Sequence, residues 1–122
     1  MVQPGTKLNV ADNTGAKIAQ CFNIPGGTRK RYARIGEIIT ASIKKAEPRR
    51  EVKTHQKVKA VIVRQKQNFR RGDGSYIRFD ENACVLLSEG KVIRGNRIFG
   101  PVPRELKDKG FEKIVTLAKD VV

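Results

Sequence analysis

Short runs of β-branched and other apolar residues recur along the first ninety positions of the chain. Apolar and polar side chains alternate within most of these runs, which predicts strands with one buried face. The runs are residues 6–10, 17–24, 35–43, 58–64, 76–79 and 83–87. Segments rich in glycine, proline and asparagine separate the runs and predict tight turns. A chain of short strands joined by turns favours a small closed β-barrel, because closure removes exposed strand edges.

Three of these segments carry more specific expectations. In residues 17–24, Ile18, Phe22 and Ile24 fall on one face of the expected strand. Residues 58–64 form the strongest strand pattern, with apolar side chains on both faces. Asp73 and Gly74 lie between two short extended segments, and this dipeptide is typical of a tight β-hairpin. We therefore expect a hairpin with its turn at Asp73–Gly74.

The hydrophobic period changes near the C-terminus. Pro103 and Gly110 stand where a short helix would begin and end. The apolar residues beyond this helix recur with helical spacing; they are Phe111, Ile114, Val115 and Ala118. Such a stripe predicts a second helix that packs on the barrel.

Length sets the scale of the molecule. The 122 residues suffice for one domain with a real core. We expect a single domain over residues 1–122, with residues 1–102 forming the barrel and a ribbon, and residues 103–122 forming a helical segment. No apolar run approaches the length of a membrane span, and the N-terminal residues do not resemble a secretory signal.

The charge of the chain points to a polyanionic partner. The net charge is +14, and residues 29–78 hold 16 basic and 4 acidic side chains. Like charges at this density repel one another unless a partner offsets them. Nucleic acid is the usual partner, whereas an anionic membrane surface would call for an amphipathic basic helix, and these cations lie in strand-like and turn-like segments.

Candidate catalytic chemistry is sparse. The chain has one histidine, His55, and it lacks a nucleophile elbow and a phosphate-binding loop. Asp80 and Glu81 are adjacent, so on a strand they would point to opposite faces. Cys21 and Cys84 lie among apolar residues and are expected to be buried thiols without a metal, since no paired cysteine motif accompanies them. We expect no catalytic site, no metal and no cofactor.

Two classes of nucleic-acid-binding protein are open at this point. A β-barrel translation factor or RNA chaperone would share the basic composition, but it would cycle on and off ribosomes. A small RNA-processing enzyme would need His55 or Asp80 for turnover of RNA.

A longer pattern begins at residues 60–63, Ala-Val-Ile-Val, and continues through Asp73–Gly74 to the run Ala-Cys-Val-Leu at residues 83–86. This pattern resembles the signature of the universal large-subunit ribosomal protein fourteen family. Residues 8–16 resemble the family's first hairpin, residues 31–33 and 35–36 its next segment, and residues 97–102 and 104–106 its closing segment. Asn96 and Pro103 depart from the residues usual in the family. The resemblance covers essentially the full chain, and the bacterial or organellar form is the closer one.

The resemblance implies a mainly β fold: a small five-stranded closed antiparallel β-barrel with a protruding β-ribbon and short C-terminal α-helices. It implies a structural role in translation, with binding to large-subunit ribosomal RNA near the subunit interface and bridges to small-subunit RNA. It also implies contacts with large-subunit proteins three and nineteen, and docking of a ribosome silencing factor in bacterial members. The expected location is a cytoplasmic ribosome, with an organellar ribosome also open.

The basic clusters and the resemblance together give the candidate site residues. The residues expected to bind ribosomal RNA are Arg29, Lys30, Arg31, Lys44, Lys45, Arg49, Arg50, Lys53, Arg64, Lys66, Arg70, Arg71 and Arg78. Arg97 and Lys113 lie in segments that resemble the family's interface for bridging and silencing-factor docking.

Overall fold

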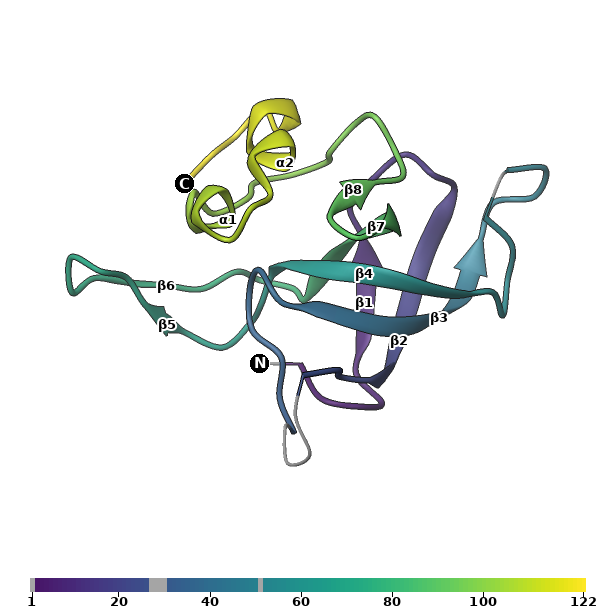
Figure 1. Ribbon diagram of the computed structural model, residues 1–122, viewed down its shortest axis with the longest axis horizontal. Helices are drawn as coiled ribbons and strands as arrows, with labels where there is room; N and C mark the ends of the chain where they lie inside the picture. The colour runs from purple at the N-terminus through teal and green to yellow at the C-terminus, as the bar shows by residue number, and fades with distance from the viewer. Residues whose placement is uncertain (1, 27–30, 51) are drawn as a thin grey trace.

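A computed structural model describes residues 2–26, 31–50 and 52–122 of the protein. Five strands form a closed sheet (Figure 1). They are β1 (Lys7–Val10), β2 (Ala16–Asn23), β3 (Ile38–Ala46), β4 (Lys57–Arg64) and β7 (Ala83–Glu89). Pairing of β1 with β7 closes the barrel. The predicted mainly β fold with a five-stranded closed barrel is thus confirmed.

The closing pair of strands differs from the expectation of a fully antiparallel barrel. The pairs β1–β2, β2–β3, β3–β4 and β4–β7 are antiparallel, but β1 and β7 run parallel, with Asn9 opposite Ala83 and Val10 opposite Cys84. The odd number of strands is the cause. When each strand reverses the direction of the one before, the first and the fifth run the same way.

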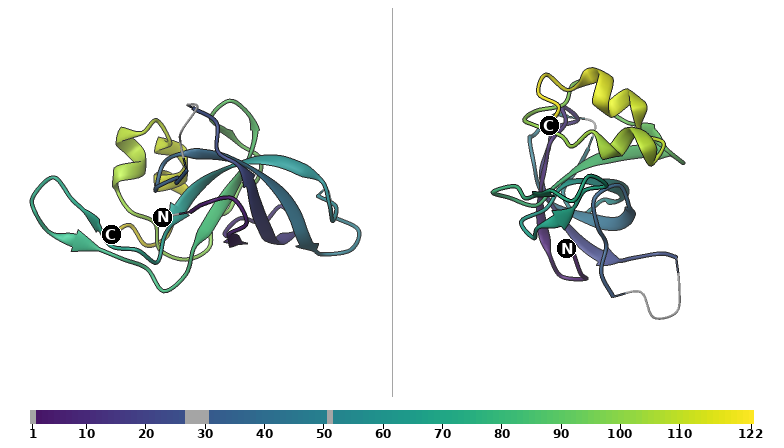
Figure 2. Two further views of the ribbon diagram at one scale, coloured as in Figure 1. Left: turned by 90° about the horizontal axis from the view of Figure 1, so that it is seen from below. Right: turned by 90° about the vertical axis from the view of Figure 1, so that its left-hand side faces the viewer.

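The predicted hairpin is present as a ribbon that projects from the barrel (Figures 1 and 2). Its strands are β5 (Phe69–Arg70) and β6 (Tyr76–Ile77). In the turn, Asp73 accepts hydrogen bonds from the backbone and the hydroxyl of Ser75, at 3.0 and 2.6 Å. Gly74 has φ +90°, a left-handed conformation that glycine adopts without steric cost.

Two strands depart from the sequence pattern. β3 begins at Ile38 and not at residue 35, because Gly36 has φ +86° and the Glu37 amide donates to the Arg34 carbonyl in a turn. In β2 the predicted face is wrong: Phe22 is exposed, and Ala19 and Cys21 are buried instead. The β2–β3 register shifts between Ile18 and Ala19, and a bulge of this kind re-aims the side chains beyond it.

A short strand and two short helices complete the chain and cover part of the barrel. The strand β8 (Val92–Ile93) pairs with β7. The helices α1 (Glu105–Asp108) and α2 (Glu112–Leu117) lie together on the side of the barrel that carries β7 and β8 (Figure 1). Their buried residues Leu106 and Ile114 belong to the same hydrophobic cluster as the barrel core.

The strand β4 is buried on both of its faces. Residues 60–64 are buried in succession, although alternation alone would bury every second one. A strand that is covered on both sides has a near-continuous apolar sequence. The expectation that the C-terminal helices pack on the barrel is thereby confirmed.

Candidate nucleic-acid interface

Two groups of the predicted RNA-binding cations lie at opposite ends of the molecule. The turn at residues 46–56, between β3 and β4, lies at one end of the long axis (Figure 1). The ribbon β5–β6 lies at the other end. The predicted basic clusters therefore do not merge into one patch.

Backbone hydrogen bonds tie both ends of the turn at residues 46–56 to the barrel. The His55 amide donates to the Ile43 carbonyl at 2.6 Å, and the Glu47 amide donates to the Gly15 carbonyl at 2.7 Å. Val52 is buried beneath the turn. Arg49 and His55 adopt left-handed conformations with φ 64° and 69°, which are uncommon for residues other than glycine. This frame leaves the side chains at the turn surface facing outward.

Arg49 and Lys53 are both exposed on this turn. Together with the buried Val52 they line a hollow of about 400 Å³. No acidic side chain of the described residues forms an ion pair with either of them. These two cations are therefore available to an anionic partner.

Arg50 combines an internal contact with exposure. Its guanidinium donates to the Asn13 carbonyl at 3.1 Å, and its Nε lies 3.5 Å from the Glu47 carboxylate. The side chain crosses Gly15, where a Cβ atom would collide with it. Arg50 and Arg94 line a polar hollow of about 270 Å³. Arg94 has no place among the sequence-predicted site residues, since no basic neighbour marks it in the sequence.

The ribbon and its flanks expose Lys66, Arg70 and Arg78. Arg71 behaves differently, because its side chain is only 12% exposed. Its Nε lies 2.8 Å from the Glu105 carboxylate on α1, and its guanidinium also donates to the carbonyl of Val122. Arg71 therefore ties the ribbon to the C-terminal segment.

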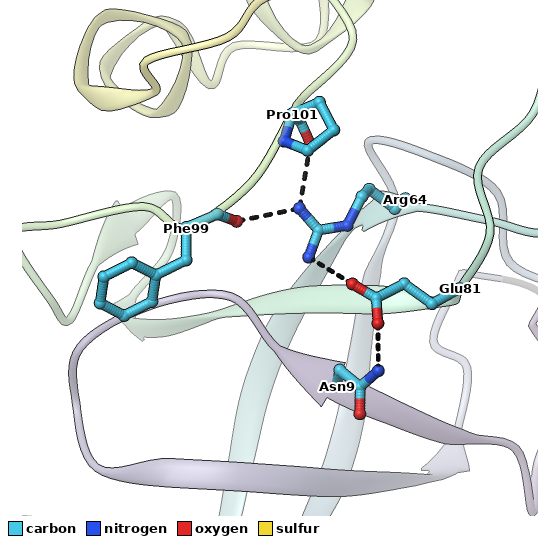
Figure 3. A network of polar contacts seen from close by, with 5 residues as sticks. All are labelled: Asn9, Arg64, Glu81, Phe99 and Pro101. Carbon is cyan, nitrogen blue, oxygen red and sulfur yellow. Dashed lines mark hydrogen bonds and ion pairs between the residues drawn. The ribbon is translucent and has the colours of Figure 1, made fainter.

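Arg64 is the clearest departure from the predicted RNA-binding set. It is buried, and its guanidinium donates to the carbonyls of Phe99 at 2.9 Å and Pro101 at 3.0 Å (Figure 3). It also pairs with Glu81 at 2.9 Å, which in turn accepts a hydrogen bond from Asn9. This guanidinium holds the segment 99–101 against the barrel, so its assignment to RNA is corrected to a structural one.

Five further residues belong to the predicted RNA-binding set. Arg31, Lys44 and Lys45 are exposed. Arg29 and Lys30 lie outside the described residues.

Arg97 and Lys113, expected to share a docking surface, are both exposed. The Arg97 amide donates to the Asn13 side chain at 3.2 Å, which anchors its backbone. Arg97 lines a hollow of about 410 Å³ together with Phe99, Leu117 and Lys119. Lys113, on α2, is not part of that lining.

Burial raises the pKa of three groups in the barrel core: the Asp12 carboxyl and the thiols of Cys21 and Cys84. It raises the pKa of the Asp12 carboxyl, against the lowering effect of hydrogen bonds from Thr14 and Leu86. It also raises the pKa of the Cys84 thiol, which keeps that group protonated and unreactive. Cys21 and Cys84 are free and buried, as the sequence predicts.

The described residues contain no cluster of three or more histidine, cysteine or acidic side chains suited to a metal ion. Among the same residues, no helix is long and apolar enough to span a bilayer.

Fold and surface together define a small basic β-barrel protein that presents cationic side chains on a turn and a ribbon. The model of the family described as "Ribosomal protein L14p/L23e" matches residues 1–122, and the chain belongs to this family. It is accordingly a structural protein of the large ribosomal subunit, acts in translation and is not an enzyme. The resemblance noted in the sequence is confirmed.

Proposed function

We propose that the protein binds large-subunit ribosomal RNA near the subunit interface, through the exposed cations of the turn 46–56 and of the ribbon. Arg49 and Lys53 carry this proposal, since they are exposed on the turn and lack acidic partners among the described residues. Arginine and lysine side chains that neutralise phosphates release bound counterions, and this release drives binding.

The remaining predicted cations extend this surface. Lys44 and Lys45 lead into the turn, and Arg50 is exposed on it. Lys66, Arg70 and Arg78 supply the charge of the ribbon, with Arg31 exposed elsewhere on the barrel. A rigid scaffold with arginine-rich turns suits recognition of folded RNA by its shape and phosphates.

Finer partners belong to the same proposal. Family resemblance supports bridges to small-subunit RNA and contacts with large-subunit proteins three and nineteen. It also supports docking of a ribosome silencing factor at Arg97 and Lys113. The exposed Phe99 beside Arg97 gives that surface an apolar contact as well as charge.

Salt-dependent binding to large-subunit RNA tests the proposal. On a nucleic-acid duplex, each phosphate contact contributes about −0.9 to the slope of log affinity against log salt concentration. The double variant Arg49→Ala/Lys53→Ala should flatten the slope by about 2. The variant Lys7→Ala/Lys17→Ala removes the same charge from exposed positions on β1 and β2 and serves as the control.

Equal slopes for the two double variants would overturn the assignment of the turn. Binding that does not weaken as salt increases would overturn the electrostatic basis of the whole proposal.

A further inference from the structure

A cleft of about 500 Å³ lies where the ribbon leaves the barrel and passes α1. Its walls come from the loop before β3, the chain between β4 and β5, the first ribbon strand and the helix α1. The figures show the ribbon and α1 at the same end of the molecule (Figures 1 and 2). A volume of this size is typical of a pocket for a small molecule or a single nucleotide.

Gln65 gives the cleft a buried polar group in need of a partner. The residue lines the cleft and is 1% exposed. Its side-chain Nε2 donates to the Gln67 carbonyl at 3.0 Å, whereas no donor of the described residues reaches its Oε1. A buried acceptor without a donor is costly to the fold. Rotation about the last side-chain bond of a glutamine costs little energy. A small rotation of this bond in Gln65 would turn the oxygen toward a donor in the cleft.

The mouth of the cleft is cationic. Arg34, Arg70 and Lys109 line it and are exposed, and the Glu37 carboxylate lines the same cleft. Arg71 also lines it, but Glu105 neutralises that guanidinium. Three exposed cations around one opening favour an anionic ligand, and arginine is well suited to hold a phosphate through paired hydrogen bonds.

The wall suits an aromatic base. Phe69 lines the cleft and is half-buried against the core, which fixes the ring. Asn68 lines the rim and is exposed. Unstacked bases of RNA bind proteins by stacking on aromatic side chains and by hydrogen bonds to their edges, for which amide side chains are suited.

We propose that this cleft holds one unpaired nucleotide that ribosomal RNA extrudes from its stack. The base lies against Phe69 with an edge donor on Gln65 Oε1, and the phosphate meets Arg34 and Arg70. This inference rests on the proposed RNA-binding function and deepens it. A peptide of a neighbouring protein is the competing occupant, and the cationic mouth favours the nucleotide.

Base-specific chemical modification of RNA in large subunits reconstituted with the full chain tests the proposal. The wild-type protein should protect one unpaired base. In subunits with Gln65→Leu, the reactivity of that base should rise about 5-fold, the factor expected for one lost hydrogen bond of about 1 kcal/mol. Gln20→Leu makes the same change on β2, away from the cleft, and should leave the reactivity unchanged.

Arg34→Ala serves as a second cleft variant, because this exposed residue can change without disturbing the core. It should raise the reactivity of the same base. No change with either variant in subunits that incorporate the protein would overturn the proposal. A photo-cross-linker at position 68 should attach to RNA, and attachment to a neighbouring protein would overturn it in favour of a peptide.

The two proposals fail separately. If Arg49→Ala/Lys53→Ala flattens the salt dependence as expected, but no base becomes more reactive in the cleft variants, only the cleft proposal is contradicted. If the cleft protects a base from modification, but binding of the protein to RNA does not depend on salt, the assignment of the turn is contradicted.

Discussion

A single buried arginine organises contacts between distant parts of the chain. Arg64 ends β4 and donates to carbonyls of the segment 99–101, while Glu81 balances its charge (Figure 3). Backbone carbonyls and one carboxylate are the partners that a buried guanidinium requires. Gly100 passes directly over this group, with φ +81°.

Substitution of Gly100 by alanine should destabilise the fold for two separable reasons. A Cβ atom there would lie 2.5 Å from Arg64 Nη1, and the left-handed backbone costs about 1–2 kcal/mol for a residue other than glycine. Gly74→Ala is the control, because Gly74 shares the left-handed φ but has open space around it. Urea unfolding should show the larger loss for Gly100→Ala, and equal losses would contradict a close approach to Arg64.

Asp12 gives the stability of the barrel a dependence on pH. Burial raises the pKa of this carboxyl in the folded state above its ordinary value of 3.8. Its stabilising contribution is therefore complete below the ordinary pKa and is lost as the pH rises through the folded pKa. Asp12→Asn removes the titrating carboxyl group. Because the asparagine side chain has one oxygen where aspartate has two, it can no longer accept hydrogen bonds from both Thr14 and Leu86.

The wild-type free energy of unfolding, measured relative to Asp12→Asn, should consequently fall between about pH 4 and neutral pH. Denaturant titrations of both proteins across this range measure the difference. A difference that grows with pH would mean that the folded pKa lies below the ordinary one.

At the scale of elements, the ribbon is long, thin and short of internal hydrogen bonds. Its paired strands have two residues each. An isolated two-stranded hairpin is at best marginally stable in water. The ion pair of Arg71 with Glu105 therefore supplies a tertiary contact that the ribbon needs.

Replacing Arg71 by methionine should loosen the ribbon and leave the barrel intact. Hydrogen exchange of the β5 and β6 amides should accelerate about tenfold or more, as expected for loss of a partly buried, charge-assisted hydrogen bond. Amides of β3 and β4 should keep their protection. Arg78→Met, at an exposed ribbon position, is the matched control. Equal acceleration in both variants would show that Arg71 does not anchor the ribbon.

The elements themselves were predictable where local patterns are strong. The positions of the strands β1, β2, β4 and β7 follow from runs of apolar residues, and the ribbon turn follows from its turn residues. The bulge in β2 and the late start of β3 depend on pairing with neighbouring strands, which alternation along one strand does not encode. The prediction for the face on which Phe22 lies was wrong for this reason.

At the scale of the whole molecule, sequence predicts the charge but not its distribution in space. Arg64 and Lys66 are close in sequence, yet one is buried and the other exposed. The difference arises from the C-terminal segment that folds over β4, a contact between residues more than thirty positions apart. Arg34 and Arg70 come together at the cleft for the same kind of reason.

The placement of two groups of cations, one on the turn 46–56 and one on the ribbon, gives the molecule its central property. The turn 46–56 and the ribbon extend in opposite directions from a rigid core (Figure 2). Such a shape can contact separate RNA segments at once, and two linked contacts bind more tightly than either alone.

A density map of the large subunit assembled with this chain tests that property most directly. The account predicts phosphate oxygens within hydrogen-bond distance of the Arg49 and Lys53 side chains at one end and of Arg70 or Arg78 at the other. It also predicts that Arg64 makes no RNA contact. A map in which both ends face solvent or protein, with no phosphate near these side chains, would contradict the account.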